Sequence, residues 1–244
     1  MKLRIRTTIV GRTLACIIGL LVSASLLFQL GRMELGWGQS HGLKGLFDLG
    51  RESNIPTYFS SMVLLLAAAL LFLVAKHKSR EGDSYRAHWF GLATGFLLMS
   101  VDEIAMLHEN MYRIPKMLGL EAPEAAVSLY WLLPYMLVFA LLAIPYTGFV
   151  RHLDSRTRRL FVTAGLLYVS GALGMEVVGD FVWAATDQSP TWTKVLATTT
   201  EESLEMTGAA LFVVALVRYL GQAKDEFVIA FSDGAETGSH LSER

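Results

Sequence analysis

The sequence predicts an all-α protein, a bundle of six helices that crosses a membrane with both termini in the cytoplasm. Hydrophobic residues make up 53% of the 244 residues, and the mean hydropathy is +0.43. These residues come in long blocks, which is typical of segments surrounded by lipid. The lysines and arginines lie almost entirely between the blocks, as expected for the loops of a multipass membrane protein.

Six blocks are long enough to cross about 30 Å of hydrocarbon at about 1.5 Å per helical residue. They cover residues 13–30, 56–75, 88–107, 127–150, 160–184 and 199–220. We expect one membrane domain over residues 1–220, followed by a polar, disordered cytoplasmic tail over 221–244. The basic start and Val22-Ser23-Ala24 would also suit a cleaved signal peptide, but the apolar run continues past Ala24, which favours an uncleaved span.

Charge decides the orientation. Most of the 21 basic residues lie near the N-terminus, in the loops after the second and fourth spans, and at the C-terminal end. By the positive-inside rule these segments are cytoplasmic. We expect the lipid bilayer as a partner and no nucleic acid, because the basic residues are dispersed among loops. The single cysteine, Cys16, lies in the first span, which excludes an internal disulfide and a cysteine-ligated zinc.

Carboxylates within the spans are the strongest functional signal. An acid in hydrocarbon costs roughly 2.5 to 3.5 kcal/mol, so it needs a proton, a cation, water or a partner. Counting along the helices places the acids of the third, fifth and sixth spans near one membrane face, the outer one. The candidate residues of this polar site are Asp102, Glu103, His108, Glu109, Glu176, Asp180, Glu202 and Glu205.

Helical spacing gives these spans acidic stripes. Asp102 and Glu109 are seven residues apart, and Glu176 and Asp180 are four apart, spacings that share a helix face. Glu109 and Asp180 would also suit solvated groups at the headgroup level. Hydroxyl groups for the site could come from Tyr58, Ser60 and Ser61 at the outer start of the second span and from Ser100 in the third, but packing between helices is the favoured role for the serines.

Helix capping competes with a functional role for part of the sixth span. Glu201 and Glu202 follow three threonines at the T-x-x-E spacing of a capping box, and capping is the favoured interpretation for both. Capping does not reach Glu205. We favour a functional site for the deeper acids because no lysine or arginine of these spans lies at their depth. These acids are Asp102, Glu103, Glu176 and Glu205.

Three hypotheses follow from this chemistry. The first is an outward-facing acidic pocket that binds a cation or takes up protons. The second is a metal-assisted enzyme that acts on a lipid or apolar substrate, with a divalent metal (Mn, Fe or Zn) held by Asp102, His108, Glu176 and Glu205. The lack of a paired Glu-x-x-His motif and of further well-placed histidines disfavours di-iron and zinc-hydrolase sites. The third is a structural or assembly subunit whose acids pair with a partner chain.

Four segments resemble a family of bacterial multipass membrane proteins to which no activity is attached. They are N-I-P-T-Y-F-S-S at 54–61, S-V-D-E-x4-H-E at 100–109, G-A-L-G-M-E at 171–176 and E-E-S-L-E-M at 201–206. The resemblance covers most of residues 48–220. It implies an integral membrane protein of bacterial type, hence of the plasma (inner) membrane, and implies no cofactor or catalytic residue.

Overall fold

The computed structural model describes residues 6–37, 43–110, 127–186 and 189–222, and all regular structure in these ranges is helical. The predicted all-α class is confirmed. The elements in chain order are α1 (Thr7–Met33), α2 (Leu43–Phe47), α3 (Ile55–Arg80), α4 (Arg86–Ala105), α5 (Leu107–Asn110), α7 (Val127–His152), α8 (Ser155–Val169), the π-helix η2 (Ser170–Met175), α9 (Glu176–Ala185) and α10 (Trp192–Gln222).

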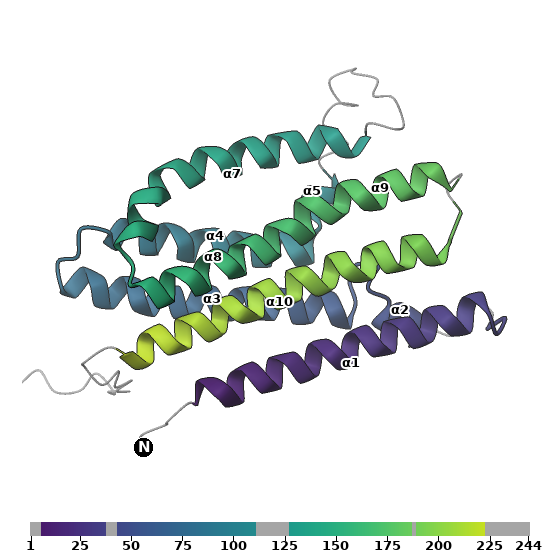
Figure 1. Ribbon diagram of the computed structural model, residues 1–244, viewed down its shortest axis with the longest axis horizontal. Coiled ribbons are helices and arrows are strands. Elements are labelled where there is room, and N and C mark those ends of the chain that lie inside the picture. Colours follow the sequence, from purple (N-terminus) through teal and green to yellow (C-terminus); the bar gives the residue numbers. More distant parts are fainter. Residues whose placement is uncertain (1–5, 38–42, 111–126, 187–188, 223–244) are drawn as a thin grey trace, which may run out of the picture.

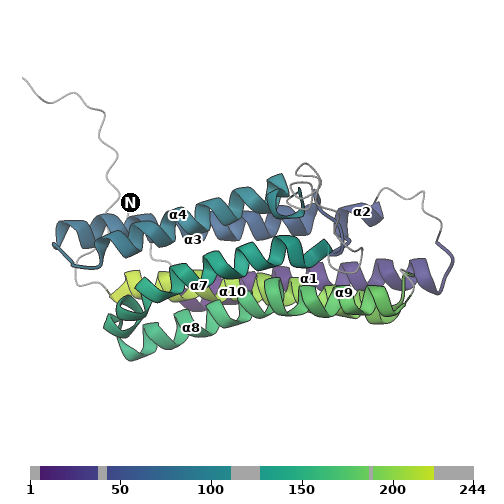
Figure 2. The ribbon, with the colours of Figure 1, turned by 90° about the horizontal axis from the view of Figure 1, so that it is seen from above.

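The long helices lie side by side along one axis of the molecule (Figure 1). After a quarter turn, α3 and α4 form one layer, and α8, α9 and α10 lie in another (Figure 2). Helix α10 is central because it contacts α1, α3, α8, η2 and α9. The bundle has two ends. Helix α4 ends and α10 begins at one of them, whereas α8 begins and α10 ends at the other (Figure 1).

Four helical segments of the described chain are long and apolar enough to cross a membrane, which is compatible with an integral membrane protein. These are Thr7–Met33, Ile55–Arg80, Ser155–Ala185 and Trp192–Gln222. Helices α4 and α7 coincide with the other two predicted spans but do not belong to this set. The count of six spans and the orientation of the termini therefore stay predictions. The predicted tail lies outside the described residues, apart from the end of α10 at Gln222.

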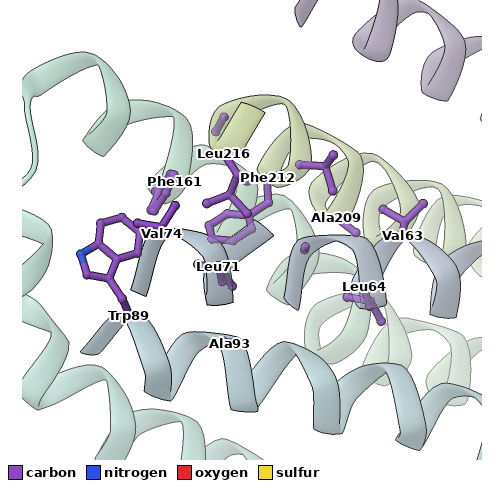
Figure 3. Packing of buried hydrophobic residues seen from close by; sticks show 14 of the residues in the cluster. Val63, Leu64, Leu71, Val74, Trp89, Ala93, Phe161, Ala209, Phe212 and Leu216 are labelled. Carbon is purple, nitrogen blue, oxygen red and sulfur yellow. The ribbon is translucent and has the colours of Figure 1, made fainter. Parts of the chain in front are cut away.

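The hydrophobic core lies between α3, α4, α8 and α10. Figure 3 shows Leu71 of α3 close to Phe212 of α10. The Leu71 side chain is completely buried, and the ring of Phe212 stacks on Phe96 with centroids 4.6 Å apart. Trp89 of α4 meets Phe149 of α7 edge to face at 4.8 Å. In lipid such close packing, rather than exclusion of water, holds helices together.

Helices α8 and α10 touch through their backbones at Gly208. A Cβ atom on Gly208 would lie 2.6 Å from the backbone nitrogen of Tyr168 and 2.8 Å from the carbonyl oxygen of Ala164. Any side chain there would push the two helices apart. Glycine is therefore required for this approach, which sets the distance between α10 and the rod formed by α8, η2 and α9.

Candidate acidic pocket

A cavity of about 490 Å³ lies where α4 ends and α10 passes η2. We call it the acidic pocket because seven carboxyl groups line it, together with the single ammonium group of Lys194 among its described lining residues. The acids are Glu52, Asp102, Glu103, Glu176, Glu201, Glu202 and Glu205. Met99, Tyr168 and Leu173 contribute larger, mostly apolar side chains to its wall.

The structure brings five of the eight predicted site residues to this pocket, which are Asp102, Glu103, Glu176, Glu202 and Glu205. Asp180 does not line it, and its Oδ2 atom is buried without a hydrogen-bond partner in the described part of the chain. The backbone of His108 and Glu109 lies in α5, but their side chains lie outside the described part of the structure. That the shared pocket is a functional site remains a proposal.

The capping interpretation of Glu201 and Glu202 is wrong. Helix α10 begins at Trp192, so both acids lie well inside it. Thr191 occupies the start of the helix, where its Oγ1 accepts a hydrogen bond from the backbone nitrogen of Lys194 at 3.3 Å. The helix then continues through the three threonines, where a threonine hydroxyl can form a hydrogen bond with a backbone carbonyl one turn earlier in the same helix. Thr200 Oγ1, for example, donates to the carbonyl of Leu196 at 2.7 Å.

The expected helical stripe from Asp102 to Glu109 is also wrong. Helix α4 ends at Ala105 because Met106 adopts a left-handed backbone conformation, with φ of 51°. The short helix α5 starts anew after it. Positions on the two sides of such a break do not keep the seven-residue periodicity of one continuous helix. Asp102 thus reaches the pocket on the last turn of α4, independently of Glu109.

A π-helical turn shapes the wall opposite α4. The segment η2 carries Ala172 and Leu173 into the pocket lining, and Glu176 follows it directly as the first residue of α9. Gly171 lies against α10, since a Cβ there would be 2.8 Å from both the Glu201 carbonyl oxygen and the Glu205 Cγ. Single π-turns inside α-helices are frequent at functional sites. The sequence carries no periodic signal for this one.

Glu176, Glu201 and Lys194 meet on one side of the pocket. Glu176 and Glu201 both line the pocket there, Glu176 from the start of α9 and Glu201 from α10. Lys194 Nζ and Glu201 Oε2 both lie over Gly179, at 2.9 and 3.8 Å from the position of a Cβ on that glycine. The expectation that no basic residue shares the depth of the acids is therefore wrong, because α10 starts early enough to include Lys194.

Glu52 also lines the pocket, although it is not among the residues predicted for the site. Its Oε2 accepts a hydrogen bond from Thr57 Oγ1 at 3.2 Å. Asn54 caps α3 by accepting from the backbone nitrogen of Thr57 at 3.1 Å and ties the preceding loop by donating to the carbonyl of Asp48 at 2.7 Å. The Asn-Ile-Pro start of α3 is a recognisable helix signal and could have placed Glu52 next to the acids.

The described side chains form no metal-binding cluster of three or more His, Cys, Asp or Glu residues. Asp102, Glu176 and Glu205 thus line one cavity without the mutual spacing of metal ligands. His108, the fourth suggested ligand, has a side chain outside the described part of the structure.

The helices and the pocket of the described chain define a class of protein, a helical bundle compatible with an integral membrane protein, with carboxyl groups gathered around a cavity at one end. Residues 14–220 match the family described as "Domain of unknown function (DUF8692)". Because the match covers most of the chain, the protein belongs to this family, as the resemblance to an uncharacterised family implies. Comparison with curated proteins and with solved structures gave no significant match.

Proposed function

We propose that this protein is a six-span protein of the bacterial inner membrane that binds a small organic cation in the acidic pocket and holds protons there when the cation is absent. The observation that carries the proposal is that, in the described part of the chain, seven carboxyl groups and one ammonium group line the same cavity. Carboxylates that line one poorly solvated cavity repel one another. A bound cation, or protons, relieves that repulsion.

The orientation of the pocket is supported by the distribution of basic residues. Arginines and lysines cluster at the end of the bundle where α8 begins and α3 and α10 end, among them Arg80, Arg156 and Arg218. The positive-inside rule makes that end cytoplasmic. The acidic pocket at the opposite end then faces outward. Helices α4 and α7 coincide with the two remaining predicted spans, which supports six crossings.

The size and lining of the pocket favour an organic ligand over a bare ion. Cavities of roughly 300 to 1,000 Å³ accommodate small molecules, and the volume of about 490 Å³ falls in that range. Tyr168 offers an aromatic face for cation–π contact, while Met99 and Leu173 offer apolar surface for a hydrocarbon chain. Primary or quaternary amines with short alkyl chains combine these features.

Binding measurements on the purified protein in detergent test this proposal. We expect alkyl diamines and quaternary ammonium compounds to raise the melting temperature and to bind by calorimetry, whereas neutral analogues of the same size do not. A variant carrying both Glu202→Gln and Glu205→Gln should bind at least about tenfold more weakly, because two charge-assisted contacts are lost. Glu81→Gln, an exposed acid at the other end of the bundle, is the matched control.

The pH dependence of binding separates cation binding from other roles. If the pocket exchanges protons for the cation, then amine binding at neutral pH releases protons, and the calorimetric heat varies with the ionisation enthalpy of the buffer. Equal affinity of the double variant and the wild-type protein for every amine would refute the proposal. So would binding of neutral and cationic analogues with the same affinity.

A further inference from the structure

A second cavity lies at the opposite end of the bundle, where α1 begins, α8 begins and α10 ends (Figure 1). Its volume is about 340 Å³. We call it the basic cavity, because three of the six described residues that line it are arginines. The lining residues are Thr7 of α1, Arg156, Arg159 and Leu160 of α8, and Val214 and Arg218 of α10.

The positive charge of the basic cavity is not neutralised within the described part of the chain. None of its arginines forms a salt bridge there. The Nε atom of Arg218 is buried and has no hydrogen-bond partner among the described residues. Arg159 uses its own Nε to donate to the carbonyl of Ser155 at 3.2 Å, which fixes the direction of its guanidinium group.

Asp154, an acid that interacts with the basic cavity, already has another role. Asp154 caps α8 by accepting hydrogen bonds from the backbone nitrogens of Arg156 and Thr157, both at 3.0 Å. It interacts with Arg218 electrostatically, without a salt-bridge contact. One carboxylate committed to a helix start leaves an excess of positive charge among three guanidinium groups. The start of α1 at Thr7 adds the positive end of a helix dipole, and Arg6 provides no side-chain cap for it.

We propose that the basic cavity binds the phosphate group of an anionic phospholipid. Guanidinium groups match the geometry of phosphate oxygens and bond them in pairs. Leu160 and Val214 provide apolar wall beside the arginines, as a glycerol backbone and the first methylenes of an acyl chain require. Basic pockets between membrane helices near the cytoplasmic surface are suited to anionic headgroups. The bound lipid bridges α1 to α8 and α10, independently of any ligand in the acidic pocket.

Native mass spectrometry of the full-length protein tests this assignment. The protein is released from bilayer nanodiscs that contain either phosphatidylglycerol or phosphatidylcholine. We expect retained phosphatidylglycerol adducts and at least about tenfold weaker retention of phosphatidylcholine. The variant Arg156→Gln with Arg159→Gln should lose this preference while remaining folded, because both side chains are exposed. The control variant, Arg80→Gln with Arg86→Gln, removes the same charge from exposed positions at the same end of the bundle but outside the cavity. It should keep the preference for phosphatidylglycerol.

Inorganic phosphate distinguishes the lipid from a soluble ligand with the same chemistry. Phosphate at millimolar concentration should neither displace phosphatidylglycerol nor raise the melting temperature of the lipid-free protein as much as the lipid does. If phosphate alone reproduces the full stabilisation, the assignment to a lipid is overturned. Equal retention of the two lipids, or an unchanged preference in the Arg156 and Arg159 variant, overturns it as well.

Discussion

Ser61 and Ser100 join α3 to α4 through reciprocal hydrogen bonds. Ser61 Oγ donates to the carbonyl of Ser100 at 2.8 Å, and Ser100 Oγ donates to the carbonyl of Ser61 at 2.9 Å. Both side chains are buried. The pair lies one half-turn before Asp102 and therefore fixes the last turn of α4 against α3. The two serines therefore serve the packing of α3 against α4, which is the role that the sequence analysis favours for serines in the predicted spans.

Replacing either serine by alanine should destabilise the protein by about 0.5 to 1.7 kcal/mol, the range for hydrogen bonds between membrane helices. The free energy of unfolding in a detergent titration measures this effect. Because the two hydroxyls form one unit, Ser61→Ala with Ser100→Ala should cost less than the sum of the single changes. Ser170→Ala, at an exposed position, is the control. Additive effects of the two changes would contradict a coupled pair.

Gly208→Ala should separate α8 from α10. The added methyl group would meet the backbone at Tyr168 and Ala164, and backbone cannot move aside as a side chain can. We expect a loss of about 1 to 3 kcal/mol, as for overpacking of other close contacts. Gly165→Ala in α8 is the matched control, since a Cβ there meets nothing within 4 Å. Thermal unfolding measures the melting temperatures of both variants, and we expect that of Gly208→Ala to be the lower. Equal melting temperatures would disprove the close contact.

Lys194→Gln should tighten the binding of organic cations to the acidic pocket. The ammonium group shares the pocket with the proposed ligand and repels it, so its removal should raise the affinity roughly tenfold at an effective dielectric constant near 20. The affinity should change in the opposite direction to the change expected for Glu202→Gln. The two variants can therefore be compared in the same calorimetric experiment. Lys76→Gln removes one charge at the other end of the bundle and should leave the affinity unchanged.

Asp154 should make stability depend on pH in the acidic range. Hydrogen bonds from the Thr157 side chain and from the backbone nitrogens of Thr157 and Arg156 lower the pKa of its carboxyl group below the ordinary value of 3.8. A lowered pKa in the folded state stabilises the protein above that ordinary value, and the contribution is lost as the pH falls through the folded-state pKa.

Asp154→Ala should therefore cost about 1 kcal/mol at neutral pH, the usual value of a helix cap. The difference from the wild-type protein should shrink when the pH falls below about 4. Asp154→Asn keeps a capping oxygen without the charge, so it should cost less than Asp154→Ala, while its difference from the wild-type protein should change with pH by the same amount, because that change comes from the titration of Asp154 itself. Unfolding curves collected between pH 3 and 7 would show a constant difference for Asp154→Ala if the cap did not form.

Hydrophobic blocks located the long helices, because apolar side chains are required wherever a helix faces lipid or core. The ends were harder to predict. The helix predicted to start at residue 199 begins at Trp192, since polar residues extend it past its apolar part. The left-handed Met106 that ends α4 has no sequence signal, as methionine rarely adopts that conformation.

The acids of the pocket could be predicted in part. Those on α4, α9 and α10 share a depth along their helices, and depth follows from counting residues. Glu52 could not be chosen in this way because it reaches the pocket through the fold of the loop before α3. The predicted sixth span starts at residue 199 and so leaves Lys194 in a loop, whereas α10 begins at Trp192 and includes it. Glu52 and Lys194 both lie in segments whose position is set by tertiary contacts.

The π-turn at Ser170–Met175 has a consequence for the register of the whole rod. A π-turn holds one residue more than the same length of α-helix. Winding the same residues as regular α-helix would rotate everything that follows by about 100°, with a shift of about 1.5 Å along the axis. Glu176 would then face away from Glu201 while the outer shape of the bundle barely changed. The winding of this segment therefore governs whether Glu176 lines the same pocket as Glu201.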